Sequence, residues 1–124
     1  MKTKNPPLDK VIKFLENPRL HNAWLKCGPI EVYVRKGRHL INNQITNTFD
    51  VASIKVQEKQ RGKGLFKTFL IDLRSVLTTS YEYKYIYVES VLENRLLDFL
   101  PSVGFTMCPG SIPPSFYKLI KEND

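Results

Sequence analysis

Apolar residues recur in two different rhythms along this chain of 124 residues. In residues 8–15 and 66–77 they return every three or four positions, which is the spacing of one face of an α-helix. Prolines lie just before and just after the first of these segments, as is typical of helix ends. We therefore predict two amphipathic helices there, and two shorter helices at residues 20–26 and 92–99. Trp24, within residues 20–26, is expected to pack in the core.

Elsewhere apolar and polar residues alternate, as they do in a strand with one buried face. Residues 30–35 show this alternation first, and Lys36-Gly37 after them predicts a hairpin turn into a second strand at residues 38–41. The other predicted strands are residues 49–56, 83–90, 105–107 and 115–120. Because a helix separates the strands at 49–56 and 83–90, these two are expected to run parallel.

The loop between residues 57 and 66 is the most informative stretch of the chain. It holds two glycines, Gly62 and Gly64, among three basic residues, and it leads from a predicted strand into a predicted helix. The first turn of a helix has unpaired backbone N–H groups, and its dipole favours negative charge. Glycine also allows positive φ and close approach to the backbone. The loop therefore predicts a phosphate site, most suitably for a diphosphate.

Two common phosphate motifs are excluded. The G-x-x-x-x-G-K-[ST] pattern is missing, and so is the third glycine of the dinucleotide fingerprint. Arg61-Gly62-Lys63-Gly64-Leu65 instead resembles the Q/R-x-x-G-x-G/A loop of the GNAT N-acetyltransferases, which cradles the pyrophosphate of acetyl-coenzyme A. Lys59 stands where that loop usually carries Gln or Arg.

A second segment strengthens this resemblance. Residues 88–105 are similar to the GNAT segment in which an Asn supports the pantetheine arm and a Gly-Phe pair opens the next strand, here Asn94 and Gly104-Phe105. The resemblance implies an α+β (mixed α/β) GNAT-like fold. It has a central mixed, twisted sheet with a V-shaped splay between two central parallel strands, flanked by about four helices. We expect a single domain over residues 1–124, with residues 1–7 flexible.

The resemblance also implies which residues bind acetyl-CoA. Main-chain groups of one strand would pair with the pantetheine amides, and backbone N–H groups of the loop would hold the pyrophosphate. The implied cofactor-binding residues are Ile54, Lys55, Val56, Arg61, Gly62, Lys63, Gly64, Leu65, Phe66 and Asn94.

The catalytic groups are less well marked. An amine acceptor needs a base, and the first candidate is Glu89, near the end of a central strand, with Asp50 and Glu31 as further candidates. Many GNAT enzymes carry a tyrosine that protonates the departing thiolate, but Leu100 or Pro101 falls at that position here. Ser90, Tyr87 and Tyr117 are the alternative proton donors.

Composition limits the partners. Nineteen Lys and Arg against twelve Asp and Glu give a net charge of +7 and a pI near 9.5, so the surface should attract anions. The cysteines, Cys27 and Cys108, and the histidines, His21 and His39, have no metal-type spacing, so we expect no metal and two free thiols in a reducing cytoplasm. No membrane segment is expected.

The expected reaction is therefore direct acetyl transfer from acetyl-CoA to a primary amine by a cytoplasmic monomer or homodimer. The acceptor stays open between a protein lysine or N-terminus, a small amine and an amine on a nucleic acid, with a macromolecular, acidic acceptor mildly favoured. One rival interpretation is a small basic nucleic-acid-binding protein. Another is a catalytically degenerate GNAT fold that binds coenzyme A or a protein partner.

Overall fold

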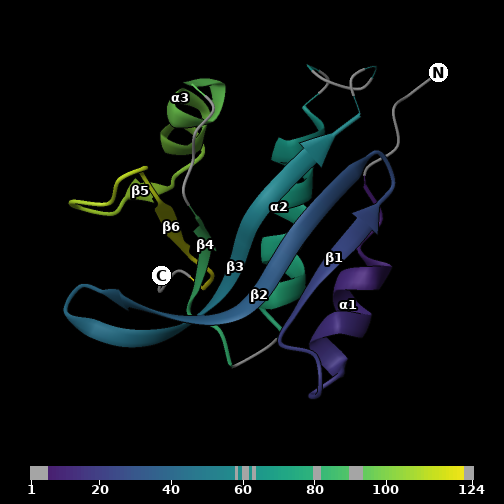
Figure 1. The fold of residues 1–124 in the computed structure, drawn as a ribbon, viewed down its shortest axis with the longest axis horizontal. Helices are drawn as coiled ribbons and strands as arrows, with labels where there is room; N and C mark the ends of the chain where they lie inside the picture. Colours follow the sequence, from purple (N-terminus) through teal and green to yellow (C-terminus); the bar gives the residue numbers. More distant parts are fainter. Residues whose placement is uncertain are drawn as a thin grey trace.

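The computed structural model describes residues 6–57, 59, 62, 64–79, 82–89 and 94–121, without the side chains of Asn94 and Arg95. The elements follow the order α1 (Asp9–Glu16), β1 (Asn22–Cys27), β2 (Ile30–Ile41), β3 (Gln44–Val56), α2 (Leu65–Leu77), β4 (Tyr85–Val88), α3 (Asn94–Ser102), β5 (Thr106–Met107) and β6 (Phe116–Leu119). The strands form one six-stranded sheet in the order β1-β2-β3-β4-β6-β5 (Figure 1).

The sheet is mixed, as predicted. β3 and β4 are parallel, with α2 as the connection between them, and all the other neighbouring strands are antiparallel. The predicted parallel pair and the two final strands are thus confirmed. The expectation that residues 1–7 are flexible falls mostly on residues 1–5, which lie outside the described residues. Pro6 is buried, and Pro7 lies against Gly28 in the turn between β1 and β2.

Two predictions about the first half of the chain are wrong. Residues 20–26 do not form a helix, because Ala23, Leu25 and Cys27 alternate with outward-facing residues and complete the edge strand β1. The described residues accordingly contain three helices, where about four were expected. Trp24 points outward on this strand and is 49% exposed, so it does not pack in the core.

The hairpin predicted at Lys36-Gly37 is also wrong. β2 runs straight through Gly37, and the turn lies at Asn42-Asn43, whose φ angles are 51° and 64°. Asparagine tolerates this left-handed conformation, and a two-residue turn with both φ angles positive matches the twist of a hairpin. β3 therefore begins at Gln44, five residues earlier than predicted.

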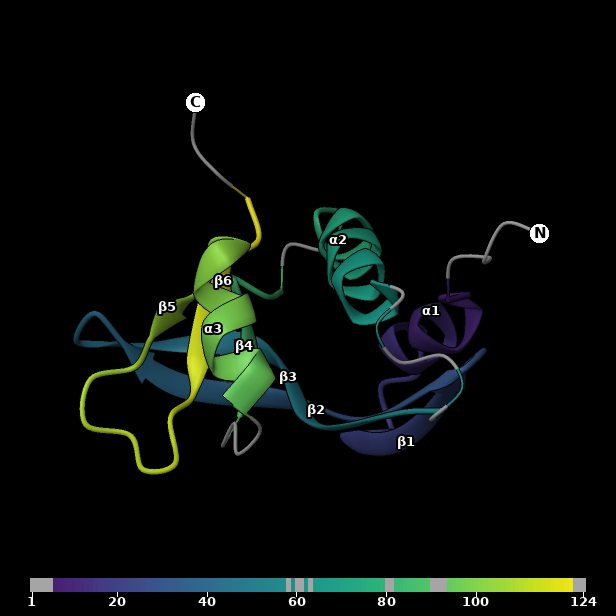
Figure 2. The same cartoon turned by 90° about the horizontal axis from the view of Figure 1, so that it is seen from above.

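One face of the sheet carries the main core. Seen from above, α1 and α2 lie on the same side of the strands (Figure 2). Phe14 of α1 packs edge-on against Phe49 of β3 at 6.1 Å, and Phe66 of α2 contacts Phe99 of α3 at the same ring-centre distance. A smaller cluster of Ile41, Tyr85 and Tyr87 lies on the other face of the sheet. We call the first the helix-covered face and the second the open face.

Candidate functional site

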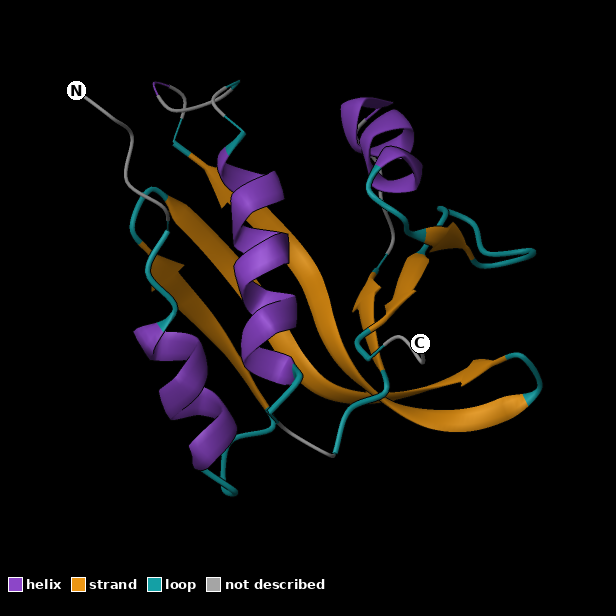
Figure 3. Cartoon of the chain, turned by 180° about the vertical axis from the view of Figure 1, so that it is seen from behind, coloured by secondary structure: helices purple, strands orange, loops and turns teal. Residues whose placement is uncertain are grey.

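β3 and β4 pair over only four residues and then diverge. Their register runs from Thr48 opposite Tyr85 to Val51 opposite Val88, and the last bond is donated by the Glu89 N–H to the Val51 carbonyl at 3.1 Å. Beyond this point β3 continues to Val56 beside β2, and the two parallel strands separate in a V (Figure 3). The predicted splay is therefore present, with Glu89 at its apex.

A bulge redirects β3 at the start of the divergence. Val51 pairs with Val34 and Ser53 pairs with Tyr33, so the register with β2 skips Ala52. Among the described strands, Ile54 and Lys55 then pair only with β2. Their side chains alternate, with Ile54 against the main core and the Lys55 ammonium over the Trp24 ring on the open face at 4.9 Å.

The glycine loop leads into α2 with the conformation that the sequence suggested. Gly62 and Gly64 have φ values of 80° and 72°, which side chains rarely adopt. Apart from their chain neighbours, no atom of the described residues lies within 4 Å of where a Cβ would stand on either. Gly64 is the N-cap of α2, and no side chain in the described part of the chain caps this helix end. Leu65 is buried, so only its main chain can serve a ligand. Arg61 and Lys63 lie outside the described residues.

The second GNAT-like segment is described only in part. Asn94 is the first residue of α3, without its side chain, and Ser90 lies outside the described residues. Gly104-Phe105 leads into β5, and Gly104 has a φ of 93°. At the position of the family tyrosine, Leu100 is fully buried and Pro101 is exposed in the last turn of α3, so neither offers a hydroxyl.

A polar cluster lies on the open face beside the apex. Asp50 is only 2% exposed, and its Oδ1 accepts a 2.6 Å hydrogen bond from the Thr48 hydroxyl. Its Oδ2 lies 2.9 Å from His39 Nε2 and 3.8 Å from Arg35 Nη2. Arg35 also forms an ion pair with Glu89. These residues, Arg35, His39, Thr48, Asp50 and Glu89, form one connected network, which we call the open-face cluster.

Gly37 makes room for this cluster. A Cβ on Gly37 would stand 2.2 Å from Asp50 Oδ2, so the carboxylate occupies the place of a side chain on the neighbouring strand. From the sequence, Gly37 predicts a turn, whereas in the structure it leaves room for a carboxylate. A glycine inside an alternating strand can also mark the close approach of another group, and this is what Gly37 does here.

Tyr87 of β4 completes the cluster. Its ring stacks on His39 with a centre distance of 3.7 Å and an angle of 11° between the planes. Burial raises the pKa of the Tyr87 phenol, opposed in part by a hydrogen bond with Ser115, so the hydroxyl keeps its proton at neutral pH.

The remaining predicted candidates lie in different places. Tyr117 is opposite Tyr87 in the register, whereas Glu31 pairs with Lys55 away from the apex. His39 was not singled out from the sequence.

The structure adds three findings on the thiols, on metal binding and on membrane-spanning helices. Both cysteines are free thiols. Within the described ranges, no group of three or more His, Cys, Asp or Glu side chains could hold a metal ion, and no helix there has the length and apolar character needed to span a membrane.

Comparison with known proteins gives similarity in structure alone. No protein-family model and no curated protein sequence matches the chain. Among solved structures, it is similar to a mutant AtaT toxin bound to the C-terminus of the antitoxin AtaR and acetyl-CoA, with a TM-score of 0.62 and 13% identity. The KacTA–DNA complex gives a TM-score of 0.61 and 11% identity. These matches cover 73% of this chain and 58% of each of those chains.

At 11–13% identity the likeness to these structures is one of fold alone. This chain has a GNAT-like fold. AtaTR bound with acetyl-CoA is similar as well, at a TM-score of 0.52 and 14% identity over 73% of this chain and 66% of that one. The expected fold class is thereby confirmed, and the GNAT-like chain spans 58% of the length of the first two of these relatives.

Proposed function

We propose that this GNAT-like chain is an N-acetyltransferase that binds acetyl-CoA between the diverging ends of β3 and β4. Two observations carry the proposal together. The parallel strands β3 and β4 separate at Val51 and Glu89, and the helix between them, α2, begins at Gly64, which has a positive φ and makes no side-chain cap. An uncapped helix start favours an anion such as a pyrophosphate. Acetyl-CoA is bound in two of the similar structures, which supports the same ligand here.

In this proposal the chain binds the cofactor mostly through its main chain. N–H groups of Gly62, Gly64, Leu65 and Phe66, together with Arg61 and Lys63, hold the pyrophosphate. Main-chain groups of Ile54, Lys55 and Val56 pair with the pantetheine amides, with Asn94 on the opposite side. Acetyl-CoA is a co-substrate in this proposal. The proposed step uses no metal.

The proposed reaction is direct transfer. The acceptor amine attacks the thioester carbonyl, an N–C bond forms, and a strand N–H of Ile54 or Lys55 stabilises the oxyanion. The C–S bond then breaks and coenzyme A leaves as a thiolate that must gain a proton. The amine must lose one, and a lysine-type amine with a pKa of about 10.4 is mostly protonated at neutral pH. A base is therefore required.

Two bases compete for this role. Glu89 lies at the apex, but its ion pair with Arg35 stabilises the carboxylate and so weakens it as a base. His39 is the second candidate, because the Asp50 carboxylate accepts a hydrogen bond from Nε2–H and leaves Nδ1 to take a proton. For the thiolate, Tyr87 is a protonated hydroxyl within the same cluster, and Ser90 remains a proposed donor.

Calorimetric titration with acetyl-CoA tests the cofactor site. Gly64→Asp and, separately, Gly62→Asp place a carboxylate at the helix start, and we expect each to weaken binding at least about tenfold. Gly110→Asp is a matched control, because Gly110 also has a positive φ of 74° and open space around it, in a loop between β5 and β6. It should bind as the native chain does. A folded native chain that does not bind acetyl-CoA would overturn the proposal.

The pH dependence of acetyl transfer separates the two bases. With polylysine, spermidine and an acidic lysine-containing peptide as acceptors, kcat/KM is measured from pH 4 to 9 for the native chain, Glu89→Gln and Asp50→Asn. A rise in rate with pH that is altered in Asp50→Asn and kept in Glu89→Gln identifies His39, whose Nε2 lies 2.9 Å from Asp50 Oδ2. A rise that vanishes in Glu89→Gln and is kept in Asp50→Asn identifies Glu89. A preference for the acidic peptide would support an acidic, macromolecular acceptor.

One observation favours the nucleic-acid alternative. Trp24 is half-exposed on the open face, its ring centre lies 5.4 Å from that of Tyr33, and the Lys55 ammonium lies over it. An aromatic pair beside a cation is a surface on which single-stranded bases stack. Because Trp24 is the sole tryptophan, quenching of its fluorescence by a single-stranded oligonucleotide, lost in high salt, tests this function directly.

A further inference from the structure

The hairpin of β2 and β3 extends past the rest of the sheet. β1 pairs with β2 only as far as Arg35, and β4 begins opposite Thr48 of β3. Residues 38–47 therefore form a two-stranded arm, which projects from the body in Figures 1 and 3. Two strands alone bury little apolar surface.

The arm displays an apolar pair on one side. Leu40 and Ile45 are directly opposite each other in the register, and each is 69% exposed. On the other side Ile41 is buried with Tyr85 and Tyr87, so the arm is held to the body through its open face. Large aliphatic residues at the free end of a sheet favour pairing with another chain. An apolar cross-strand pair stabilises the arm fully only when another group covers it and removes it from water.

A hollow lies between the arm and the body, with a volume of about 750 Å³. Ile45 and Asn47 of β3 line one side of it, and Lys84 and Leu119 line the other. On that side of β3, residues 44–46 face no strand in the described part of the chain, because β4 starts only opposite Thr48. The hollow thus borders an open strand edge as well as apolar side chains.

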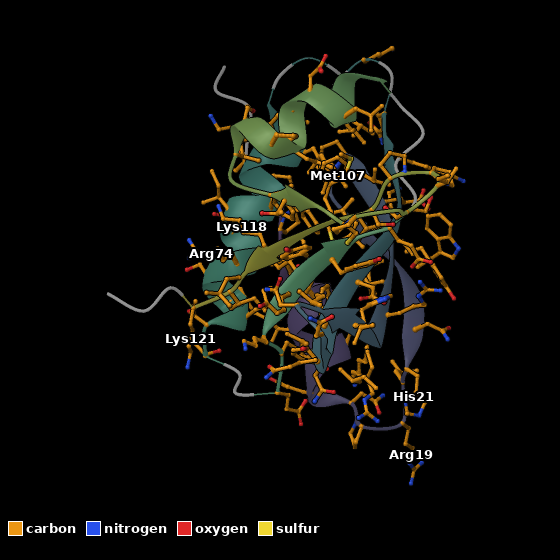
Figure 4. The ribbon with its side chains drawn as sticks, turned by 90° about the vertical axis from the view of Figure 1, so that its left-hand side faces the viewer. Arg19, His21, Arg74, Met107, Lys118 and Lys121 are labelled. Carbon is orange, nitrogen blue, oxygen red and sulfur yellow. The ribbon has the colours of Figure 1, made fainter. Side chains whose placement is uncertain are left out.

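The walls of the hollow are mainly basic. Among the described residues that line it, Arg38, Lys84 and Lys121 are basic and Glu82 is acidic. Lys121 lies on the same side of the molecule as Arg74 and Lys118 (Figure 4). A second copy of this chain, with a net charge of +7, is a poor match for such a surface. The tyrosines among the described lining residues, Tyr83 and Tyr85, are buried, so they offer the bases of a nucleic acid no exposed ring.

We propose that the hollow beside the arm binds an extended, acidic segment of another protein. The segment adds to the edge of β3 at residues 44–46 and places apolar side chains against Ile45 and Leu119. Its carboxylates lie against Arg38, Lys84 and Lys121, since strand addition takes affinity from the main chain and specificity from alternate side chains. This binding does not depend on acetyl transfer.

A labelled ten-residue peptide of alternating Glu and Val is a suitable probe, with its Lys-Val counterpart as a control. Fluorescence anisotropy should show binding of the acidic peptide at least about tenfold tighter than that of the basic one. Amide hydrogen exchange at Ile45 and Thr46 should slow when the acidic peptide is bound. No binding of the acidic peptide by the folded chain, or equal binding of both peptides, would overturn the proposal.

Matched variants localise the binding. Arg38→Glu with Lys84→Glu should abolish it, whereas Lys10→Glu with Lys13→Glu, exposed on α1, makes the same change in net charge and should leave affinity within about twofold. Ile45→Ser should weaken binding about tenfold, while Ile71→Ser, at a 57% exposed position on α2, should not. Equal losses in both charge variants would mean unspecific attraction. A native dimer in light scattering that Ile45→Ser dissociates would assign the arm to a second copy instead.

Discussion

The two faces of the sheet carry their buried groups in opposite ways. On the helix-covered face the buried residues of the main core are aliphatic, aromatic or, at Cys27, a thiol. On the open face a carboxylate, Asp50, is buried almost as completely and is held by Thr48, His39 and Arg35. The first arrangement stabilises a fold by removing apolar surface from water. The second costs desolvation that apolar residues would avoid.

The apolar core and the buried charged groups thus lie on opposite faces of the same sheet. A buried carboxylate network is weak evidence for stability, and this one lies where β3 and β4 diverge. We therefore infer that the helix-covered face sets the stability of the fold, whereas the open face holds the side chains proposed above for acetyl transfer. Substitutions on the two faces should accordingly differ in size and in kind.

The largest effect is expected on the helix-covered face. Phe69 of α2 is fully buried in the main core, and Phe69→Ala removes its ring and leaves a cavity. We expect a loss of about 3–5 kcal/mol in the free energy of unfolding, measured by urea denaturation. Phe66→Ala, at a half-buried position one turn away, is the control and should cost clearly less. A loss below about 1 kcal/mol for Phe69→Ala would contradict the comparison.

The helix-covered face was largely predictable from the sequence. The helical period of α2, the parallel direction of the strands on either side of it and the positive φ angles of the glycines before it follow local rules and agree with the structure, although β3 begins five residues earlier than predicted. β1 was mistaken for a helix because its six residues have the composition of either element, and only their alternation separates the two.

The open-face cluster was not predictable in the same way. Arg35, His39 and Asp50 come together through the register of β2 and β3, which depends on where the hairpin turns. With the turn predicted at Lys36-Gly37, the register gives no reason to place His39 beside Asp50; with the turn at Asn42-Asn43, the two residues come together. Glu89 was found because it follows a strand whose direction the βα connection dictates, so no cross-strand register was needed.

A second prediction uses alkaline pH to test how strictly the helix-covered face excludes charge. Burial raises the pKa of the Cys27 thiol from 9.0 to about 11. Between these values the unfolded chain has lost this proton and the folded chain keeps it, so stability falls as pH rises. The loss should reach roughly 2–3 kcal/mol by pH 11.

The measurement is the difference in unfolding free energy between the native chain and Cys27→Ala from pH 8 to 11. This difference removes contributions from other groups, among them Tyr83, whose pKa burial raises to about 12. The two curves should stay a constant distance apart below pH 9 and converge above it. Parallel curves up to pH 11 would show that the thiol ionises within the folded chain at little cost.

A third prediction concerns Gly37 and Asp50 on the open face. Gly37→Ala drives a methyl group into Asp50 Oδ2 and should cost about 1–3 kcal/mol. In an Asp50→Ala background the space is free, and the same substitution should cost nothing or stabilise the strand, because glycine is the poorer strand residue by about 0.5–1 kcal/mol. Equal costs in both backgrounds would mean that the glycine serves the backbone of β2 rather than the carboxylate.

The smallest effect is expected at the rim of the open face, where solvent weakens every charged contact. The Lys55 ammonium lies 4.9 Å from the centre of the half-exposed Trp24 ring, and such a contact contributes about 0.5–1 kcal/mol at an exposed site. Lys55→Gln should lower the unfolding free energy by no more than that, and by almost nothing in a Trp24→Leu background. A cost near that of Gly37→Ala would mean that the rim, like the buried cluster, holds charge in a fixed geometry. The division of the open face into a buried charged cluster and a solvated rim would then be wrong.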